Sequence, residues 1–293
     1  MSRRLPAAGS ALLALLAVAA CAPADSNDST AAGSSSASAS SAAACTPADL
    51  KTLTANTLTI GTDKPAYSPW FVDDKPSNGK GFESAVAYAV AQQLGYTNDQ
   101  VKWSTVTFNA AAQPGPKKFD FDINQFSITD ERKQAVDFSS GYYDVTQAVV
   151  ALKGDKAASA TSIADLKDLK LGAQVGTTSY DAIKSEIAPS KQPAVFDDND
   201  KAKLALNNGQ IDALVVDLPT ALYLASAELD NGVVVGQLPQ TSTTPEQFGL
   251  VLAKDSSLTS CVTSAVDALR KDGTLDKLKT QWLTEGANAP ELK

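Results

Sequence analysis

Histidine is entirely missing from the 293-residue sequence, and stretches rich in lysine and arginine are missing as well. Because histidine is the usual general base near neutral pH and a common zinc ligand, its absence argues against histidine-based catalysis and most zinc sites. The net charge of −8 argues against binding to nucleic acid or to anionic lipid headgroups. We therefore expect neither a metal nor a cofactor.

Long apolar runs are also scarce. One such run, residues 11–20, consists of Ala, Leu and Val and follows Arg3 and Arg4. It is too short to span a bilayer, so residues 1–20 are predicted to be an export signal. The small residues before Cys21 resemble the lipobox of bacterial lipoproteins, in which the signal is removed and this cysteine is lipidated. The alternative is an ordinary signal peptide with an unrelated cysteine.

Large apolar side chains are rare in residues 21–45, which are mostly Ser and Ala with a few polar residues. Such a composition cannot bury enough surface to offset the entropy lost on ordering, so a flexible tether is predicted. A tether is consistent with a lipid anchor at Cys21 that holds the protein on the outer face of the cell membrane. No further membrane segment is expected.

Cysteine is sparse, and after signal removal two cysteines other than Cys21 remain, Cys45 and Cys261. Two thiols outside the cell usually pair. A bond between them would join the two ends of the exported chain and stabilise it by roughly 4–5 kcal/mol in the loop-entropy model. The alternative is two buried free thiols.

Short apolar strands alternate with amphipathic helices from residue 57 onward, which is typical of an α/β fold. The first group comprises strands at 58–62, 101–106 and 119–124 and a helix at 82–94. The second comprises strands at 169–174, 194–196 and 211–216 and helices at 178–187 and 201–207. A strand at 248–253 and helices at 258–270 and 275–283 follow.

Two extended segments, 145–152 and 241–251, separate the two groups and are interpreted as crossings between two lobes. The predicted fold has residues 46–146 with 244–293 in one lobe and 147–243 in the other, each lobe a mostly parallel sheet flanked by helices. Two crossings would form a hinge that lets the lobes close on a ligand. A single continuous sheet is the alternative.

Polar residues follow the predicted strand at 119–124, where ligands bind open α/β sheets. Asn124, Gln125 and Ser127 offer donors and acceptors, and the planar fork of Arg132 matches a carboxylate. Taken alone, Arg132 is more often part of a surface salt bridge.

The second group offers two further candidates. Thr177 and Thr178 stand where a strand meets a helix, a position that suits an anion but equally suits a helix cap. Asp217 directly follows the apolar strand at 211–216 and suits an ammonium group, whereas Asp212 within that strand is interpreted as structural. Together, these groups match the two charges of an amino acid.

Motifs across the exported chain resemble the polar amino acid-binding family of periplasmic type 2 solute-binding proteins. They stand at 60–63, 67–70, 81–83, 119–132, 136–143, 172–178, 209–217 and 272–282. The resemblance implies a two-lobed periplasmic-binding-protein type 2 fold and a monomer. It also implies a binding protein rather than an enzyme, which captures a small polar amino acid and delivers it to the permease of an ABC importer.

The resemblance also implies roles for individual residues. Arg132 and Thr178 would bind the α-carboxylate, and Asp217 would bind the α-ammonium with help from Ser127 and Gln125. Four more residues would line the pocket of the ligand side chain, namely Asp63, Tyr67, Trp70 and Gln174.

Departures from the family pattern leave the bound amino acid undetermined. One extra residue lies between Asp63 and Tyr67, and Asn124 and Gln125 are bulkier than the small residues common there. One alternative function is a dehydratase-type enzyme on the same scaffold, with Asp63 or Asp217 as acid or base. Another is a ligand-sensing receptor subunit, which would need a membrane helix and an output domain.

Overall fold

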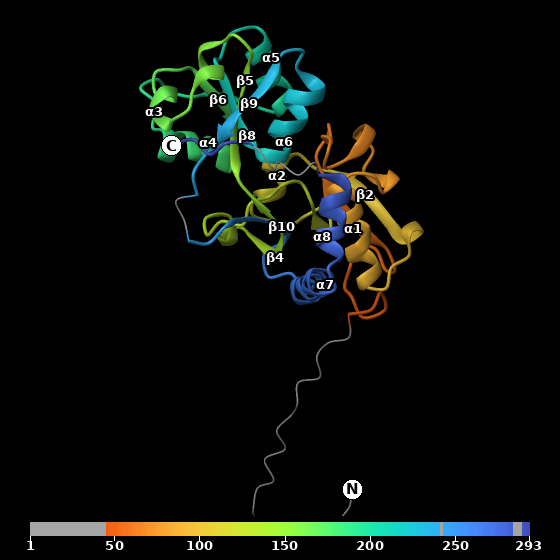
Figure 1. The fold of residues 1–293 in the computed structure, drawn as a ribbon. Helices are drawn as coiled ribbons and strands as arrows, with labels where there is room; N and C mark the ends of the chain where they lie inside the picture. The colour runs from red at the N-terminus through yellow and green to blue at the C-terminus, as the bar shows by residue number, and fades with distance from the viewer. Residues whose placement is uncertain (1–44, 241–242, 284–288) are drawn as a thin grey trace, which may run out of the picture. The chain divides into compact units, whose positions relative to one another are not determined.

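The computed structural model describes residues 45–240, 243–283 and 289–293. The predicted export signal, Cys21 and nearly all of the predicted tether lie outside these residues. Within the described chain, two five-stranded sheets each carry their own helices (Figure 1). No helix in the described part is long and apolar enough to cross a membrane.

The first sheet has the strand order β2-β1-β3-β10-β4. Strand β1 runs parallel to β2 and β3, whereas β10 runs antiparallel to β3 and β4. Its strands are β1 (Leu58–Thr62), β2 (Val101–Thr105), β3 (Phe121–Asp122), β4 (Val136–Val145) and β10 (Glu246–Ala253).

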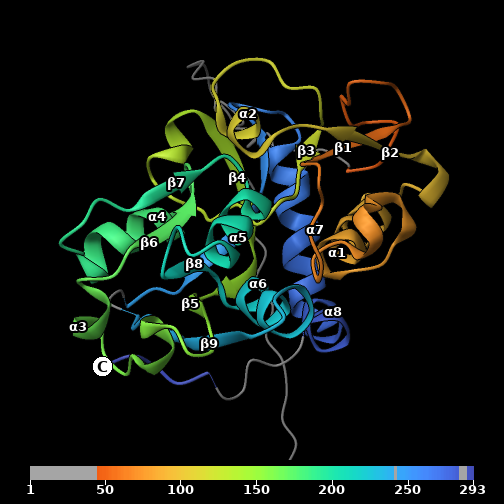
Figure 2. The same cartoon turned by 90° about the horizontal axis from the view of Figure 1, so that it is seen from above.

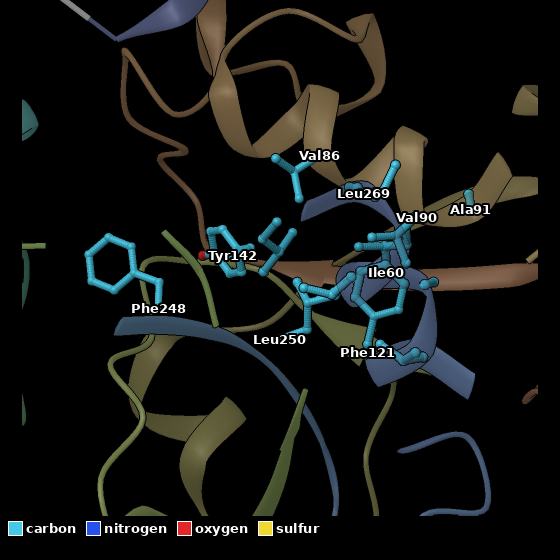
Figure 3. Close-up of a cluster of buried hydrophobic side chains, with 14 of the residues drawn as sticks. Ile60, Val86, Val90, Ala91, Phe121, Tyr142, Phe248, Leu250 and Leu269 are labelled. Atoms are coloured by element: carbon cyan, nitrogen blue, oxygen red, sulfur yellow. The ribbon is translucent and has the colours of Figure 1, made fainter. Parts of the chain in front are cut away.

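Three helices cover one face of the first sheet, namely α1 (Phe82–Gln93), α7 (Thr259–Lys271) and α8 (Thr274–Trp282). Residues Phe82, Val86 and Val90 recur at helical spacing in α1 and are at most 1% exposed, which explains why this segment forms an amphipathic helix. Figure 3 shows side chains of α1 and α7 meeting those of β1, β3, β4 and β10 in one apolar core. The short helix α2 (Phe108–Ala112) packs in a separate cluster with Phe126.

The second sheet repeats the arrangement with the order β7-β6-β8-β5-β9. Strand β6 runs parallel to β7 and β8, whereas β5 runs antiparallel to β8 and β9. Its strands are β5 (Gln147–Leu152), β6 (Leu171–Gln174), β7 (Ala194–Phe196), β8 (Ala213–Asp217) and β9 (Gly232–Gln237).

Helices pack on both faces of the second sheet (Figure 2). On one face lie α3 (Ile163–Leu166) and α4 (Thr178–Ala182), which continues as a π-helical turn (Ile183–Ile187). On the other face lie α5 (Asn199–Asn207) and α6 (Leu218–Tyr223).

The chain passes between the sheets at two places that the sequence indicated. Strand β4 ends at Val145 and β5 begins at Gln147, so the first crossing is Thr146. The second lies between the end of β9 at Gln237 and the start of β10 at Glu246. The predicted two-lobed α/β fold is confirmed. The sheets are mixed rather than mostly parallel, because β5 and β10 enter from the other lobe and run antiparallel to their neighbours.

The last residues, 289–293, lie against the second lobe. The backbone N–H of Gln237 donates to Pro290 O at 2.8 Å, and the N–H of Leu292 donates to Gln237 O at 2.9 Å. Leu292 is 1% exposed and fills the core of that lobe. The expected assignment of 244–293 to the first lobe therefore does not hold for these five residues, because burial of Leu292 fixes them to the second lobe.

The predicted disulfide between Cys45 and Cys261 is confirmed, with a Cα–Cα distance of 5.5 Å. It joins the first described residue to α7, and Cys45 packs against the core of the first lobe. The start of the described chain is therefore held covalently against the first lobe.

Candidate functional site

A cavity lies between the lobes, and most of the predicted ligand-binding residues line it. The first lobe contributes Asp63, Tyr67, Phe108, Asn124, Gln125 and Arg132, and the second contributes Gln174, Thr177, Thr178, Ser179, Asn199 and Asp217. Several of these residues stand at or just after the carboxyl ends of β1, β3, β6 and β8, the edge where open α/β sheets bind ligands. The structure therefore brings Arg132 and Asp217, from different lobes, to one cavity.

Aromatic rings and backbone carbonyls fix the guanidinium of Arg132. Its Cζ atom lies 5.4 Å from the ring centre of Phe108 and 5.6 Å from that of Phe126, and the two rings stack on each other. Its Nη1 donates to Ser127 O at 2.7 Å, and its Nη2 donates to Gly176 O in the second lobe at 2.9 Å. Although burial lowers its pKa, Arg132 remains a cation, and its guanidinium extends to the second lobe.

Two hydroxyls meet across the cleft beside this guanidinium. Ser127 Oγ, which belongs to a residue only 1% exposed, lies 3.2 Å from Thr178 Oγ1. The hydroxyl of Thr177 is already engaged in starting α4, because it accepts from the N–H of Tyr180 and donates to Gln174 O. Thr178 rather than Thr177 therefore has the hydroxyl that faces the other lobe.

Asp217 ends β8 and precedes α6, but its side chain does not cap that helix. Its Oδ1 accepts from Nε2 of Gln147 at 3.0 Å. Burial, and then the nearby Glu246, raise the pKa of Asp217 to about 8, although Gln147 and Arg132 oppose the shift. A carboxylate that burial destabilises in this way gains stability from a cationic partner.

Hydrogen bonds to Glu83 fix the position of Gln125, which lines the cavity. Gln125 has a positive φ of 49°, and its backbone N–H donates to Glu83 Oε1 at 2.7 Å. The Nε2 group of Gln125 and the hydroxyl of Tyr142 also donate to this fully buried carboxylate. Burial raises the pKa of Glu83 to about 7, and the bonds from Tyr142 and Gln125 oppose the shift. The amide nitrogen of Gln125 is therefore directed at Glu83.

Asp63 and Tyr67 both line the cavity, at the carboxyl end of β1 and in the segment that follows it. The carboxylate of Asp63 accepts from the N–H of Lys64 at 2.6 Å and from the N–H of Phe108 at 2.9 Å. Asp63 thus positions the start of α2 as well as facing the cavity. The hydroxyl of Tyr67 is buried, and this burial raises its pKa.

Trp70 does not line the cavity, contrary to the expectation from the resemblance. Its ring is 0% exposed and makes edge contacts with Phe82, Tyr143 and Phe248 in the core of the first lobe. The packing of this large apolar ring explains its position. Its Nε1 donates to Thr220 Oγ1 in the second lobe at 2.9 Å.

Sequence reasoning missed Phe108, Ser179 and Asn199 among the lining residues, and Gln147 and Glu246 behind Asp217. Gln147 carried a usable signal, since it is a polar residue at the start of a strand that is otherwise apolar. Asp212, by contrast, accepts from the N–H of Lys170, which agrees with its structural interpretation. The described residues contain no group of three or more His, Cys, Asp or Glu that could hold a metal.

Comparison with known families gives a match over residues 58–285 to the model of the bacterial extracellular solute-binding proteins, family 3. The chain is 29% identical over 235 residues to the L-cystine-binding protein TcyJ of Escherichia coli, which covers 79% of this chain and 84% of that protein. It is 28% identical to an L-arginine-binding protein of Pseudomonas aeruginosa, covering 77% of this chain and 90% of that protein.

Solved structures show the same relationship. The ancestral amino acid-binding protein AncCDT-1, described as a precursor of cyclohexadienyl dehydratase, is 34% identical, with a TM-score of 0.64 over 78% of this chain and 96% of that chain. An ancestral arginine-binding protein bound to glutamine is 32% identical, with a TM-score of 0.64 over 78% of this chain and 97% of that chain.

Proposed function

We propose that this chain, which belongs to family 3 of the bacterial extracellular solute-binding proteins, captures a polar L-amino acid between its lobes and delivers it to an ABC importer. The observation that carries the proposal is the cavity shared by Arg132 of the first lobe and Asp217 of the second. An α-amino acid carries one negative and one positive group on the same carbon atom, and this pair of side chains complements both.

Each end of the amino acid would gain charge-assisted hydrogen bonds. The fork of Arg132 and the hydroxyl of Thr178 would bind the carboxylate, and Asp217 would bind the ammonium. These interactions are stronger in a closed cleft than in water, because the effective dielectric constant is lower. Flexing at Thr146 and at the second crossing would let the lobes open and close around the amino acid.

Polar groups around the rest of the cavity favour a side chain that forms hydrogen bonds. Asp63, Asn124 and Gln174 supply acceptors or donors there, and Phe108 supplies an aromatic face. The names of similar proteins mention cystine, arginine and glutamine, all of which have such side chains.

We also propose that the protein has no catalytic activity of its own. The absence of histidine removes the commonest acid–base group, and the similar curated proteins described above, together with a glutamine-binding protein of Bacillus subtilis, are named as binding proteins. The relationship to a dehydratase precursor makes a dehydratase the second candidate, in which Asp63 or Asp217 would move the proton.

The route to the membrane is proposed from the sequence. Residues 1–20 would direct export, and lipidated Cys21 would hold the protein on the outer face of the cell membrane through the flexible segment 21–45. Lipid labelling of wild type and Cys21→Ser in a bacterial host tests this, since wild type should take up the label and the variant, which lacks the thiol, should not.

A thermal-shift screen of the exported domain against the twenty amino acids and L-cystine tests the binding function. An amino acid at 100 times its Kd adds about 2.7 kcal/mol, which raises Tm by about 5–10 °C for a domain of this size. Mass spectrometry after prolonged incubation checks for turnover. Absence of any shift, or chemical conversion of the bound compound, contradicts the proposal.

A further inference from the structure

Gln147 stands at the junction between the hinge and the ligand cavity. It is the first residue of β5 and directly follows the crossing residue Thr146. Its side chain is only 6% exposed, and the next residues of the strand, 148–151, are fully buried and apolar. A buried amide at this position needs hydrogen-bond partners, because an unsatisfied one costs about 1–3 kcal/mol.

The partners of this amide come from three separate elements. Its Oε1 accepts from Ser179 Oγ in α4 at 2.6 Å. Its Nε2 donates to Asp217 Oδ1 at 3.0 Å and to Glu246 Oε2 at 3.1 Å, and lies 3.4 Å from Thr178 Oγ1. Since an amide nitrogen carries two hydrogens, the two carboxylates are its principal acceptors.

These contacts connect the proposed ligand groups to both crossings. Glu246 is the first residue of β10, the strand that follows the second crossing, and it pairs with Val145 at the end of β4. Its other oxygen, Oε1, is buried and has no hydrogen-bond partner among the described residues. The Nε2 group of Gln147 is thus a donor shared by two carboxylates, one at the cavity and one at the hinge.

We propose that Gln147 is a positioning residue that orients Asp217 and Thr178 for the amino acid and connects them to Glu246, so that ligand capture and the hinge are coupled. The inference rests on the proposed function for the ligand roles of Asp217 and Thr178. No direct contact between Gln147 and the amino acid is required.

Removal of the amide of Gln147 would leave the carboxylates of Asp217 and Glu246 near each other with no shared hydrogen-bond donor between them. The charged groups that act on Asp217 are Glu246 and Glu83, which raise its pKa, and Arg132, which lowers it; the hydrogen bond from Gln147 also lowers it. Loss of that bond would therefore disfavour the anionic form of Asp217 that an ammonium group needs.

Two variants separate this role from packing. Gln147→Met keeps the length and bulk of the side chain but removes both hydrogen-bonding groups. Gln147→Glu keeps the shape and adds a third carboxylate, which regains a donor only when protonated. Ser185→Ala, on the exposed side of the same lobe, is the control, because its hydroxyl donates to the nearby carbonyl of Asp181 at an exposed position.

Titration calorimetry with L-arginine, L-lysine, L-histidine, L-glutamine and L-cystine measures the effect on capture. We expect Gln147→Met to lower the affinity for the amino acid that binds wild type by at least tenfold. The affinity of Ser185→Ala should equal that of wild type. For Gln147→Glu the loss should shrink as the pH falls from 8 to 5, because the protonated acid can donate as the amide does. Wild-type affinity in Gln147→Met, or a loss in Gln147→Glu that is independent of pH, overturns the inference.

Thermal unfolding without added amino acid gives a second measurement that does not depend on the proposed function. With the donor removed, Asp217 is harder to ionise; because its pKa in wild type is about 8, Tm of Gln147→Met should fall further below that of wild type as pH rises from 7 to 9. A Tm difference that does not grow over this range contradicts the coupling of Gln147 to these carboxylates. Failure of all five amino acids to bind wild type contradicts the proposed function instead.

Discussion

The substitution Asp217→Asn separates the cost of burying a charge from the benefit of binding one. Asparagine keeps the size of the side chain but cannot carry the negative charge that the ammonium group needs. Truncating one partner of a buried, hydrogen-bonded charge pair costs about 2–5 kcal/mol, so the affinity for the amino acid should fall by a factor of roughly 30 to several thousand. Titration calorimetry measures this loss.

The same substitution should stabilise the protein when no amino acid is bound. Burial raises the pKa of Asp217 to about 8 from an ordinary value of 3.8, so wild type loses stability as the pH rises through this interval. The slope is at most about 1.4 kcal/mol per pH unit, which gives an upper limit of about 3 kcal/mol between pH 5 and pH 7. Opening of the lobes would expose the carboxylate of Asp217 to water and make this loss of stability smaller.

Urea unfolding at pH 5, 6, 7 and 8 tests the sign. The free energy of unfolding of Asp217→Asn should exceed that of wild type by an amount that grows with pH. Asp212→Asn is the control, because that carboxylate lies outside the cavity and accepts from the backbone of Lys170. Equal pH slopes in wild type and Asp217→Asn, or full retention of amino acid binding, would refute the reasoning.

Three further substitutions probe other parts of the cleft and scaffold. Arg132→Ala should lower the affinity for the amino acid at least tenfold while circular dichroism shows a preserved fold, since hydrogen bonds to charged groups contribute about 1.5–3 kcal/mol each. Joint replacement of Cys45 and Cys261 by serine should lower the free energy of unfolding by about 5 kcal/mol without changing affinity, which urea unfolding and calorimetry measure together. Thr220→Val should lower the affinity about fivefold or more by calorimetry. The substitution removes the acceptor of Trp70 Nε1, and because this bond joins the two lobes, its loss destabilises the closed form and not the open one.

The positions of the main cleft residues followed from strand patterning. Asp217 comes directly after an apolar run, and Arg132 follows a short apolar strand by several residues. Because strand ends of this kind gather at one edge of a sheet, each residue could be placed at the ligand-binding edge of its own lobe, whereas the meeting of the two edges at one cavity was implied by the family resemblance. Prediction of strand 119–124 was less accurate, since β3 keeps only residues 121 and 122 in register with its neighbours.

What sequence could not supply were contacts between residues far apart in the chain. Gln147 is bonded to residues 32, 70 and 99 positions away, and no local pattern encodes such distances. Trp70 illustrates a different limit, because a ring in the core and a ring facing a ligand have the same local sequence pattern. Residues 289–293 attach to the second lobe through backbone hydrogen bonds with Gln237 and the buried side chain of Leu292, and neither signal stands out in the sequence.

The contacts between the lobes explain why capture of a zwitterion would control closure. Among the described residues, Arg132 bonds to Gly176, Ser127 lies against Thr178, and the indole of Trp70 bonds to the second lobe. Hydrogen bonds of this kind contribute about 1 kcal/mol each, which is comparable with the few kcal/mol that separate two conformations of a protein. We therefore expect direct contacts alone to leave open and closed forms close in free energy. Under the proposed function, an amino acid bound to Arg132 on one side and to Asp217 on the other would add charge-assisted bonds that exist only when the lobes meet, and this difference would shift the population toward the closed form.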